Sequence, residues 1–434
     1  MPSSDWKSAP ADADAVASFA ARDLEYRVVR TDDRALFDPY LRAETRGFLG
    51  GEQTEEQLEG TGDALAFRRF IGVYDPAALT LDEPVGTVNS WATELTLPEN
   101  RSIPMWAISG VTVAPTHRRR GIARGMLEGE LRTARDAGFA IAGLTVSEAT
   151  IYGRFGFAPA TFSERWTIET KRARWIGARA EGRLDFVSRE RLSEELAALH
   201  GRVRTARPGE IEAWPGLWRR LAGTLPAQEN SGKIRAVRYA DVDGVTRGVV
   251  VYRLSEEGTD YTKHELEVDY LLSETADAYS ALWAYVLEHD LVTTVVAQLR
   301  AVDEPLRWMI ADQRAAKVET REHGWLRIVD VPTVLTARTY ARGGRFTLSI
   351  TDALGFADGT WELSIDDSGD AAVVAHEGEP DITLSVGALS SIVLGGVRAS
   401  TLHAAGIIHA EEGVVTHLDA CFMSAQTPYL SLWY

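Results

Sequence analysis

The stretch that decides the fold runs VTVAPTHRRRGIA, from Val111 to Ala123. A predicted strand ends here, a proline turn follows, and the pattern of a helix begins directly after Gly121. The first amides of a helix have no partner within it, and the helix dipole adds positive charge there. With Arg119 and Arg120 beside it, this helix start is suited to bind a pyrophosphate. A solvated run of arginines would explain the same residues, and both interpretations stay open at this point.

A second stretch, SEATIYGRFGF, follows a buried strand that we predict over residues 140–146. Ser147 is placed to cap a short helix, and Glu148 falls in its first turn. Tyr152 lies at the end of that helix, and the pattern alone favours packing as a core tyrosine.

The chain of 434 residues is too long for one compact core, because domains typically hold about 100–150 residues. We predict a flexible N-terminal tail over residues 1–24, rich in Ala, Asp, Ser and Pro. Three folded segments follow, at 25–165, 166–324 and 325–434. The second repeats the order strand, strand, helix, strand of the first, which predicts a structural pseudo-repeat.

The net charge of −17 argues against binding to nucleic acid or to an anionic membrane. It suits a cationic substrate, although acidity also serves solubility. A single cysteine, Cys421, excludes an intramolecular disulfide, and we expect it to be a small buried hydrophobe. No apolar run approaches the roughly 20 residues of a membrane helix, and the N-terminus has no signal-peptide pattern. We therefore expect a cytoplasmic protein, and the histidine spacing indicates no metal site.

Taken together, these motifs carry a family resemblance. The Arg-x-x-Gly-x-Ala pattern after a valine-rich strand, and the later tyrosine followed by Gly-Phe, resemble the acetyl-coenzyme A signature of the GNAT N-acetyltransferases. LRIVDVP at 326–332, LGGVRASTL at 394–402 and an aromatic C-terminal residue narrow the resemblance to the Eis (enhanced intracellular survival) family. It implies an α/β (α+β) chain of two fused GNAT-type domains and a sterol-carrier-protein-like domain, assembled as a homohexamer.

The resemblance also implies residue roles. Tyr152 would be the general acid that protonates the leaving thiolate, and the C-terminal carboxylate of Tyr434 would be the general base for the amine. A free α-carboxyl is a weak base, with a pKa of about 3.5 unless burial raises it, and an ordinary buried C-terminus is the alternative. A backbone amide of the 111–113 strand would donate to the thioester oxygen. The residues implied to contact acetyl-CoA are Val111, Thr112, Val113, Arg119, Arg120, Gly121, Ile122, Ala123, Arg124, Ser147 and Glu148.

The second segment lacks a comparable loop. After the predicted strand at 266–272 comes Ser-Glu-Thr-Ala-Asp, and Glu274 and Asp277 would repel phosphate. We therefore expect one bound acetyl-CoA per chain.

The expected activity is acetyl-CoA-dependent N-acetylation of a polycationic amine, by direct transfer in a ternary complex and without a metal. The resemblance suggests aminoglycosides or lysine side chains as acceptors. Trp433 supplies no extra carboxylate next to the terminus, which departs from the acidic acceptor pocket of aminoglycoside-modifying members. The alternative is a non-enzymatic protein that binds coenzyme A or, through its carrier-like domain, a lipid.

Overall fold

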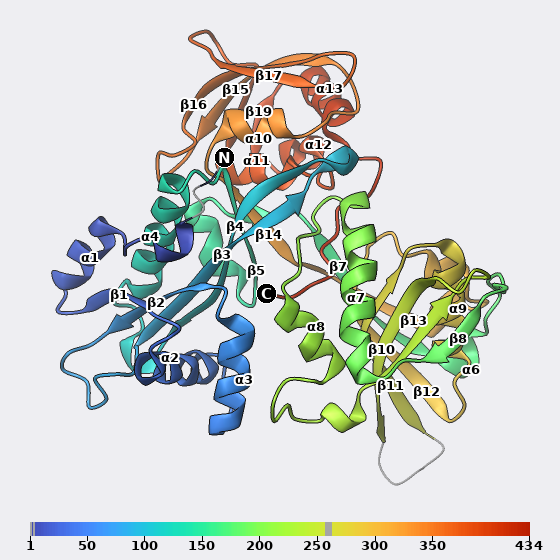
Figure 1. The fold of residues 1–434 in the computed structure, drawn as a ribbon. Coiled ribbons are helices and arrows are strands. Elements are labelled where there is room, and N and C mark those ends of the chain that lie inside the picture. Colours follow the sequence, from blue (N-terminus) through green and yellow to red (C-terminus); the bar gives the residue numbers. More distant parts are fainter. Residues whose placement is uncertain (1, 3–4, 257–262) are drawn as a thin grey trace. The chain divides into compact units, whose positions relative to one another are not determined.

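The computed structural model describes residues 2, 5–256 and 263–434, which form two compact units (Figure 1). The first unit contains the chain up to Thr161, then His323–Pro428 and Trp433–Tyr434. The second unit contains Phe162–Glu322 and Tyr429–Leu432. Each unit is described by itself below.

The first unit begins with helical structure. A 3-10 helix η1 (Trp6–Ser8) and helix α1 (Ala13–Ala20) precede the first strand, and Phe19 is fully buried. The Asp12 side chain caps α1 and also forms an ion pair of 2.8 Å with Arg132 on helix α4 (Ile122–Asp136). The expected flexible tail over residues 1–24 is therefore corrected for the described residues. The alanines that suggested disorder are also good helix formers, and they place one apolar face against α4.

The half of the first unit that holds the two predicted motifs is built on one seven-stranded sheet of order β1-β2-β3-β4-β5-β14-β6. Its strands are β1 (Glu25–Val29), β2 (Arg69–Tyr74), β3 (Gly86–Thr96), β4 (Ser102–Val113), β5 (Ile141–Thr145), β14 (Gly324–Ile328) and β6 (Ala158–Pro159). Its other helices are α2 (Arg34–Gly47), α3 (Glu55–Leu65), α4 (Ile122–Asp136) and α5 (Ala149–Tyr152), with η2 (Pro98–Asn100), η3 (Pro115–His117) and η4 (Gly153–Phe155). The apolar face of α4 packs in the core with Trp106.

Strands β4 and β5 are parallel but part from each other. They pair only at Trp106–Ala142 and Ala107–Gly143, whereas β4 continues to Val113. From there on, the described strands leave this edge of β4 unpaired. The Ala114 amide donates to Val85 on the β3 side, at 2.8 Å. Because amides of a strand alternate in direction, that of Val113 points to the open edge. The register with β3 then shifts between Thr112 and Ser109, so β4 has a bulge at Gly110 and Val111. The Gly110 carbonyl accepts from the Thr87 hydroxyl of β3, so the Val111 amide of the same peptide is directed away from it.

The C-terminal half of the first unit has a five-stranded sheet of order β17-β16-β15-β18-β19. Its strands are β15 (Gly344–Thr351), β16 (Gly359–Ile365), β17 (Ala371–Ala375), β18 (Ile382–Ser385) and β19 (Ile408–Ala410). Its helices are α10 (Val331–Ala337), α11 (Val386–Ile392), α12 (Ala399–Ala404) and α13 (Glu412–Phe422). A buried ion pair of 2.5 Å between Arg327 on β14 and Asp352 after β15 connects the two halves. Cys421 is buried, as predicted.

The second unit repeats the parting strands. Its sheet has the order β13-β7-β12-β11-β10-β9-β8, and β11 and β12 pair in parallel from His264–Val292 to Val268–Ala297. Its strands are β7 (Phe162–Glu169), β8 (Arg183–Phe186), β9 (Arg235–Ala240), β10 (Thr246–Glu256), β11 (His264–Ser273), β12 (Val292–Arg300) and β13 (Ala316–Glu322). Its helices are α6 (Thr170–Ala173), α7 (Arg189–Val203), α8 (Pro215–Ala222) and α9 (Ala276–Leu287), with η5 (Arg204–Ala206), η6 (Ser231–Lys233), η7 (Pro305–Trp308) and η8 (Gln313–Ala315). Beyond the last pair, β11 and β12 continue without pairing to each other.

The described residues contain neither a membrane-spanning helix nor a cluster of metal ligands. None of the helices there is long and apolar enough to span a bilayer. No group of three or more His, Cys, Asp or Glu in the same residues is arranged to hold a metal ion.

Candidate active site

The start of α4 is built as an anion site. Gly121 is the N-cap, with a left-handed φ of 73°, and no side chain caps the helix. Arg119 is also left-handed, with φ 62°, so the backbone turns sharply just before the helix. The first turn contains no acidic residue, and Arg118, Arg119 and Arg120 are exposed. Free amides, dipole and guanidinium groups therefore favour the same ligand, an anion.

Contacts with neighbouring elements fix this loop. Asp75 accepts from His117 Nε2 at 2.9 Å and from Arg120 at 3.5 Å, and the hydrogen bond from His117 lowers the pKa of the Asp75 carboxyl. Arg22, next to α1, donates to the Arg120 carbonyl at 2.7 Å. In contrast, Arg119 forms no ion pair with any described residue. Arg120 is partly engaged, and Arg119 keeps its charge for a ligand.

The predicted contact residues on β4 and α4 differ in what they can offer. The Thr112 hydroxyl is buried and lies 2.7 Å from that of Thr87, so it faces β3 and not the open edge. Ile122 is buried in the core, and Arg124 lies 3.9 Å from Glu128. Thr112 and Ile122 can therefore serve a ligand mainly through their backbone, whereas the Arg124 side chain is exposed.

Tyr152 ends α5, the short helix after β5. Its side chain is 7% exposed and packs edge-on to Phe157, with ring centroids 6.3 Å apart. Burial, and secondarily the charge of Glu148, raises the pKa of Tyr152 to about 12. No described residue forms a hydrogen bond with its hydroxyl. The phenol therefore stays protonated over the physiological pH range and has its donor available.

The start of α5 differs from the prediction. Glu148 is the N-cap rather than a first-turn residue, and neither it nor Ser147 caps the helix with its side chain. The prediction that Ser147 caps this helix is wrong, because the helix begins one residue later than the sequence suggested. Both residues are exposed, and Glu148 instead accepts a hydrogen bond of 3.1 Å from Thr150.

Tyr434 lies at the end of β5. The Thr145 hydroxyl donates to the terminal oxygen of Tyr434 at 2.5 Å, and the Tyr434 amide lies 3.4 Å from the same hydroxyl. The Tyr434 ring packs edge-on to Trp91, and burial raises the pKa of its phenol. The end of β5 thus holds the terminal carboxylate, and the next helix carries Tyr152. Thr145 was not among the predicted site residues, although a hydroxyl residue that ends an apolar strand was a usable signal.

A buried polar cluster was also missed. Glu44 on α2 accepts from Asn89 at 3.1 Å, and Arg68 donates to the amide oxygen of Asn89 at 3.0 Å. A Cβ atom added at Gly110 would lie only 2.4 Å from the Glu44 carboxylate, which therefore presses against β4 next to Val111. Burial raises the pKa of Glu44, while Arg68 opposes that shift. Polar residues inside strands predicted to be buried were the available signal.

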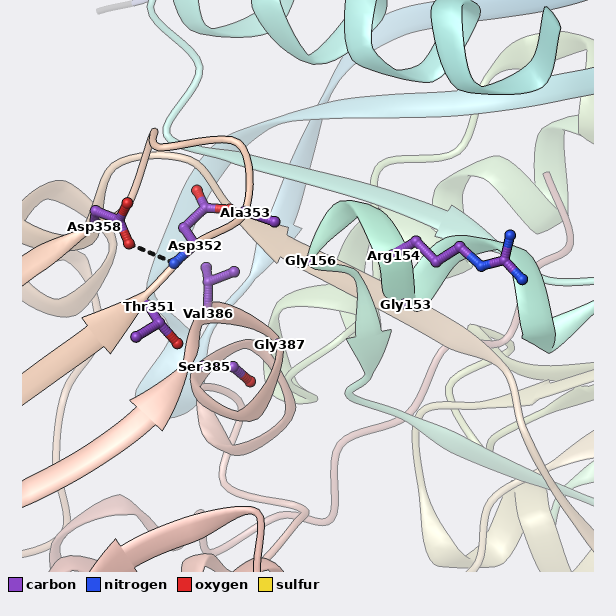
Figure 2. A pocket seen from close by; sticks show the side chains of 10 residues that line it. All are labelled: Gly153, Arg154, Gly156, Thr351, Asp352, Ala353, Asp358, Ser385, Val386 and Gly387. Carbon is purple, nitrogen blue, oxygen red and sulfur yellow. Dashed lines mark hydrogen bonds between the residues drawn. The ribbon is translucent and has the colours of Figure 1, made fainter. Parts of the chain in front are cut away.

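A cavity of about 470 Å³ lies next to η4 and is shown in Figure 2. Its lining consists of Gly153, Arg154, Gly156, Thr351, Asp352, Ala353, Asp358, Ser385, Val386 and Gly387. The Asp352 carboxylate is already used by Arg327 and by the amides of Phe356 and Ala357. Figure 2 shows the Arg154 side chain directed away from the other lining side chains. The cavity is therefore a seam between the halves of the first unit, and Tyr152 does not line it.

Comparison with known families agrees with the fold. A GNAT acetyltransferase domain model matches residues 27–160, a second matches 209–328, and a sterol carrier protein domain model matches 331–431. The fold-class prediction is thereby confirmed.

Similar proteins give the family. An uncharacterized N-acetyltransferase of Streptomyces avermitilis is 32% identical over 94% of this chain and 98% of its own length. N-acetyltransferase Eis of Mycobacterium tuberculosis is 32% identical over 84% of this chain and 90% of its own. The crystal structure of Eis1 from Mycobacterium abscessus superposes with a TM-score of 0.77 at 28% identity, covering 95% of this chain and all (100%) of that one. The chain is an N-acetyltransferase of the GNAT superfamily, and it belongs to the Eis family.

Proposed function

We propose that this enzyme transfers the acetyl group of acetyl-CoA directly to an amine of a polycationic acceptor, either aminoglycoside-like or a lysine side chain. Transfer takes place in a ternary complex. The observation that carries the proposal is the uncapped start of α4 beside the open edge of β4. Bound acetyl-CoA supplies the reactive thioester, and the residues of this chain hold and polarise it.

The phosphates are held at the start of α4, by its free amides and by Arg119 and Arg120. The extended arm of the ligand adds to β4 as a further strand, using the outward amides of Val111 and Val113. The Val111 amide donates to the thioester oxygen, where negative charge develops during transfer. The whole set proposed to contact acetyl-CoA is Val111, Thr112, Val113, Arg119, Arg120, Gly121, Ile122, Ala123, Arg124, Ser147 and Glu148.

Tyr152 is the proposed general acid. Its raised pKa, about 12, keeps the proton on the phenol until the leaving sulfur gains charge. The same shift makes it a weaker acid than a free phenol, so its effect begins as a hydrogen bond to the sulfur.

The terminal carboxylate of Tyr434 is the proposed general base. The hydrogen bond from Thr145 stabilises its charged form and fixes its orientation. In that form it binds the acceptor ammonium and takes its proton. Glu44, beside the bulge of β4, adds a second carboxylate, and the net charge of −17 favours approach of a polycation.

The decisive test is release of coenzyme A from acetyl-CoA by the purified enzyme, over a panel of aminoglycosides and lysine-containing peptides. We expect release with polyamine acceptors and none with the same acceptors after chemical N-acetylation. Release only with neutral or singly charged amines would contradict the polycationic acceptor, while leaving acetyl transfer intact.

Two further properties follow from the same proposal. We expect one acetyl-CoA to bind per chain, because the second GNAT domain lacks the loop of the first, and calorimetry would test this number. The family resemblance supports a homohexamer, which light scattering of the purified protein would test.

A further inference from the structure

The C-terminal segment occupies the parted strands of the second unit. The Tyr429 amide donates to the Pro208 carbonyl at 2.8 Å, and the Tyr429 hydroxyl donates to the carbonyl of Leu299. Leu299 lies on β12, beyond Ala297, where pairing with β11 has ended. Tyr429, Leu430 and Leu432 are all buried. The segment 429–432 therefore fills space that opens where β11 and β12 separate.

Ser431 is held by one buried carboxylate. Its amide and its hydroxyl both donate to Glu210 Oε2, at 3.3 and 3.0 Å. Its hydroxyl also lies 3.3 Å from that of Tyr270, which is on β11 beyond the last pair with β12. Tyr429 and Ser431 thus contact the two separated strands, one each.

Glu210 is an unusual residue to find here. It is 5% exposed, and burial raises its pKa to about 7, opposed by the hydrogen bonds from Ser431 and by the charges of Arg207 and Arg204. Burying a carboxyl is costly, and an apolar side chain of this size would fill the space without that cost. In the described part of the chain, the hydrogen bonds of this carboxyl come from Ser431. We therefore infer that the Glu210 carboxyl serves to hold the segment 429–432.

Ser431 lies three residues before the chain end. Three extended residues reach at most about 10 Å, so fixing Ser431 confines the terminal carboxylate to a small volume. We propose that Glu210 is a positioning residue for acetyl transfer, which acts by anchoring Ser431 and so limiting where the Tyr434 carboxylate can lie. The proposal rests on the proposed role of that carboxylate.

The test uses the full chain and three substitutions. Glu210→Leu removes the acceptor but keeps the volume, Ser431→Ala removes only a hydroxyl, and Glu210→Gln keeps a neutral acceptor. Glu212→Gln is the matched control, since Glu212 is exposed and two residues away. Two quantities are measured in each: the rate at which a carboxypeptidase releases Tyr434 from the folded enzyme, and kcat with the KM values of both substrates.

We expect Glu210→Leu to release Tyr434 at least tenfold faster and to lower kcat about tenfold, with the KM for acetyl-CoA unchanged. Ser431→Ala shows a smaller change in the same direction, and Glu210→Gln and Glu212→Gln behave like the native enzyme. Ser431→Ala decides the matter if Glu210→Leu does not fold. Native protection of Tyr434 and native kcat in folded Glu210→Leu and in Ser431→Ala would overturn the proposal.

A chain extended by one glycine after Tyr434 distinguishes the proposed role of the Tyr434 carboxylate from the positioning role of Glu210. If the extended chain keeps full activity, the proposed role of the carboxylate fails and the positioning role falls with it. If the extended chain loses activity while Glu210→Leu does not, only the positioning role of Glu210 is overturned.

Discussion

The two GNAT domains contain the same pair of parting parallel strands, with different contents. In the first, β4 leaves β5 after Ala107, and its edge stays open. In the second, Arg300 of β12 donates to the Leu271 carbonyl of β11 at 3.1 Å, and Tyr429 and Ser431 bind beyond the last pair. The fold therefore creates the gap in both copies, while side chains decide whether the gap is open to a ligand.

The helices that follow the two strands differ in the same sense. The start of α4 has no capping side chain and no acid in its first turn. The start of α9 is capped by the Thr275 hydroxyl, at 3.2 Å from the Ala278 amide, and Asp277 lies in its first turn. Glu274, just before it, pairs with Arg202 and Arg247. The start of α9 is thus already capped by a side chain and carries negative charge from Asp277 and Glu274, and both features disfavour phosphate.

The largest expected difference between the two GNAT domains is the effect of removing the Tyr152 hydroxyl. We expect Tyr152→Phe to lower kcat about a thousandfold, since general acid catalysis contributes about 10²–10⁴-fold. The dissociation constant of acetyl-CoA, measured by calorimetry, stays unchanged because the phosphate loop is intact. Tyr252→Phe is the control: it also removes one hydroxyl, but in the second unit, where that hydroxyl contacts only Tyr285 among the described residues. Native turnover of Tyr152→Phe would remove the proposed acid.

Glu210, in the second unit, makes the free energy of unfolding depend on pH. Its pKa is raised from 4.5 to about 7, so between these pH values the folded chain binds more protons than the unfolded chain. The contribution of this group to the free energy of unfolding therefore falls as pH rises through this window. The Glu210→Gln chain has no carboxyl at this position, so its free energy of unfolding does not fall in this way. Relative to the native chain, its free energy of unfolding should therefore rise by about 3 kcal/mol between pH 4.5 and 8. Urea unfolding of both chains across this range measures it.

His200 in the same unit has the opposite dependence. Burial lowers its pKa from 6.5 to about 4, so its contribution to stability is lost as pH falls through that range. Since His200 is present in both chains, it cancels in the difference between them. A difference that does not vary with pH would show that Glu210 titrates normally in the folded chain.

A substitution at Gly121 tests directly whether the start of α4 in the first GNAT domain binds acetyl-CoA. Gly121→Asp places a side chain at φ 73° and a negative charge at the start of α4, and we expect acetyl-CoA binding to weaken about 50-fold. Gly244→Asp is the matched control, because Gly244 has φ 79° and no atom near its missing Cβ, in the turn between β9 and β10. Calorimetry measures both. Equal loss of binding in the two variants would point to a general effect on folding.

Sequence predicted the local part of the site. The order of strand, turn and helix around Gly121 depends on residues that are neighbours in the chain, and periodicity with one glycine is enough to show it. The error at Ser147 is of the same local kind: β5 ends at Thr145, and a one-residue shift moves the cap to Glu148. The N-terminal tail was predicted to be flexible from its composition alone. That prediction overlooked the apolar face of the helix that became α1.

The tertiary part of the site could not be derived from patterns along the chain. The hydrogen bond between Thr145 and Tyr434 joins residues 289 positions apart, and only the family resemblance pointed to the terminus at all. Glu44 and Asn89 come from a helix and a strand whose packing no periodicity specifies. Side chains that meet through folding need the register of the sheet, which the sequence pattern leaves open.

The smallest expected effect sharpens the comparison most. Thr275→Ala removes the cap of α9 and should lower the free energy of unfolding by about 1 kcal/mol, as lost caps usually do. Thr275→Ser keeps the hydroxyl and should be neutral. The uncapped start of α9 then resembles that of α4, yet Asp277 and the segment 429–432 remain in place. We therefore expect calorimetry to find one acetyl-CoA per chain as before. A second bound acetyl-CoA would mean that the cap alone separates the two copies, and that the segment and the acidic residues do not close the second one.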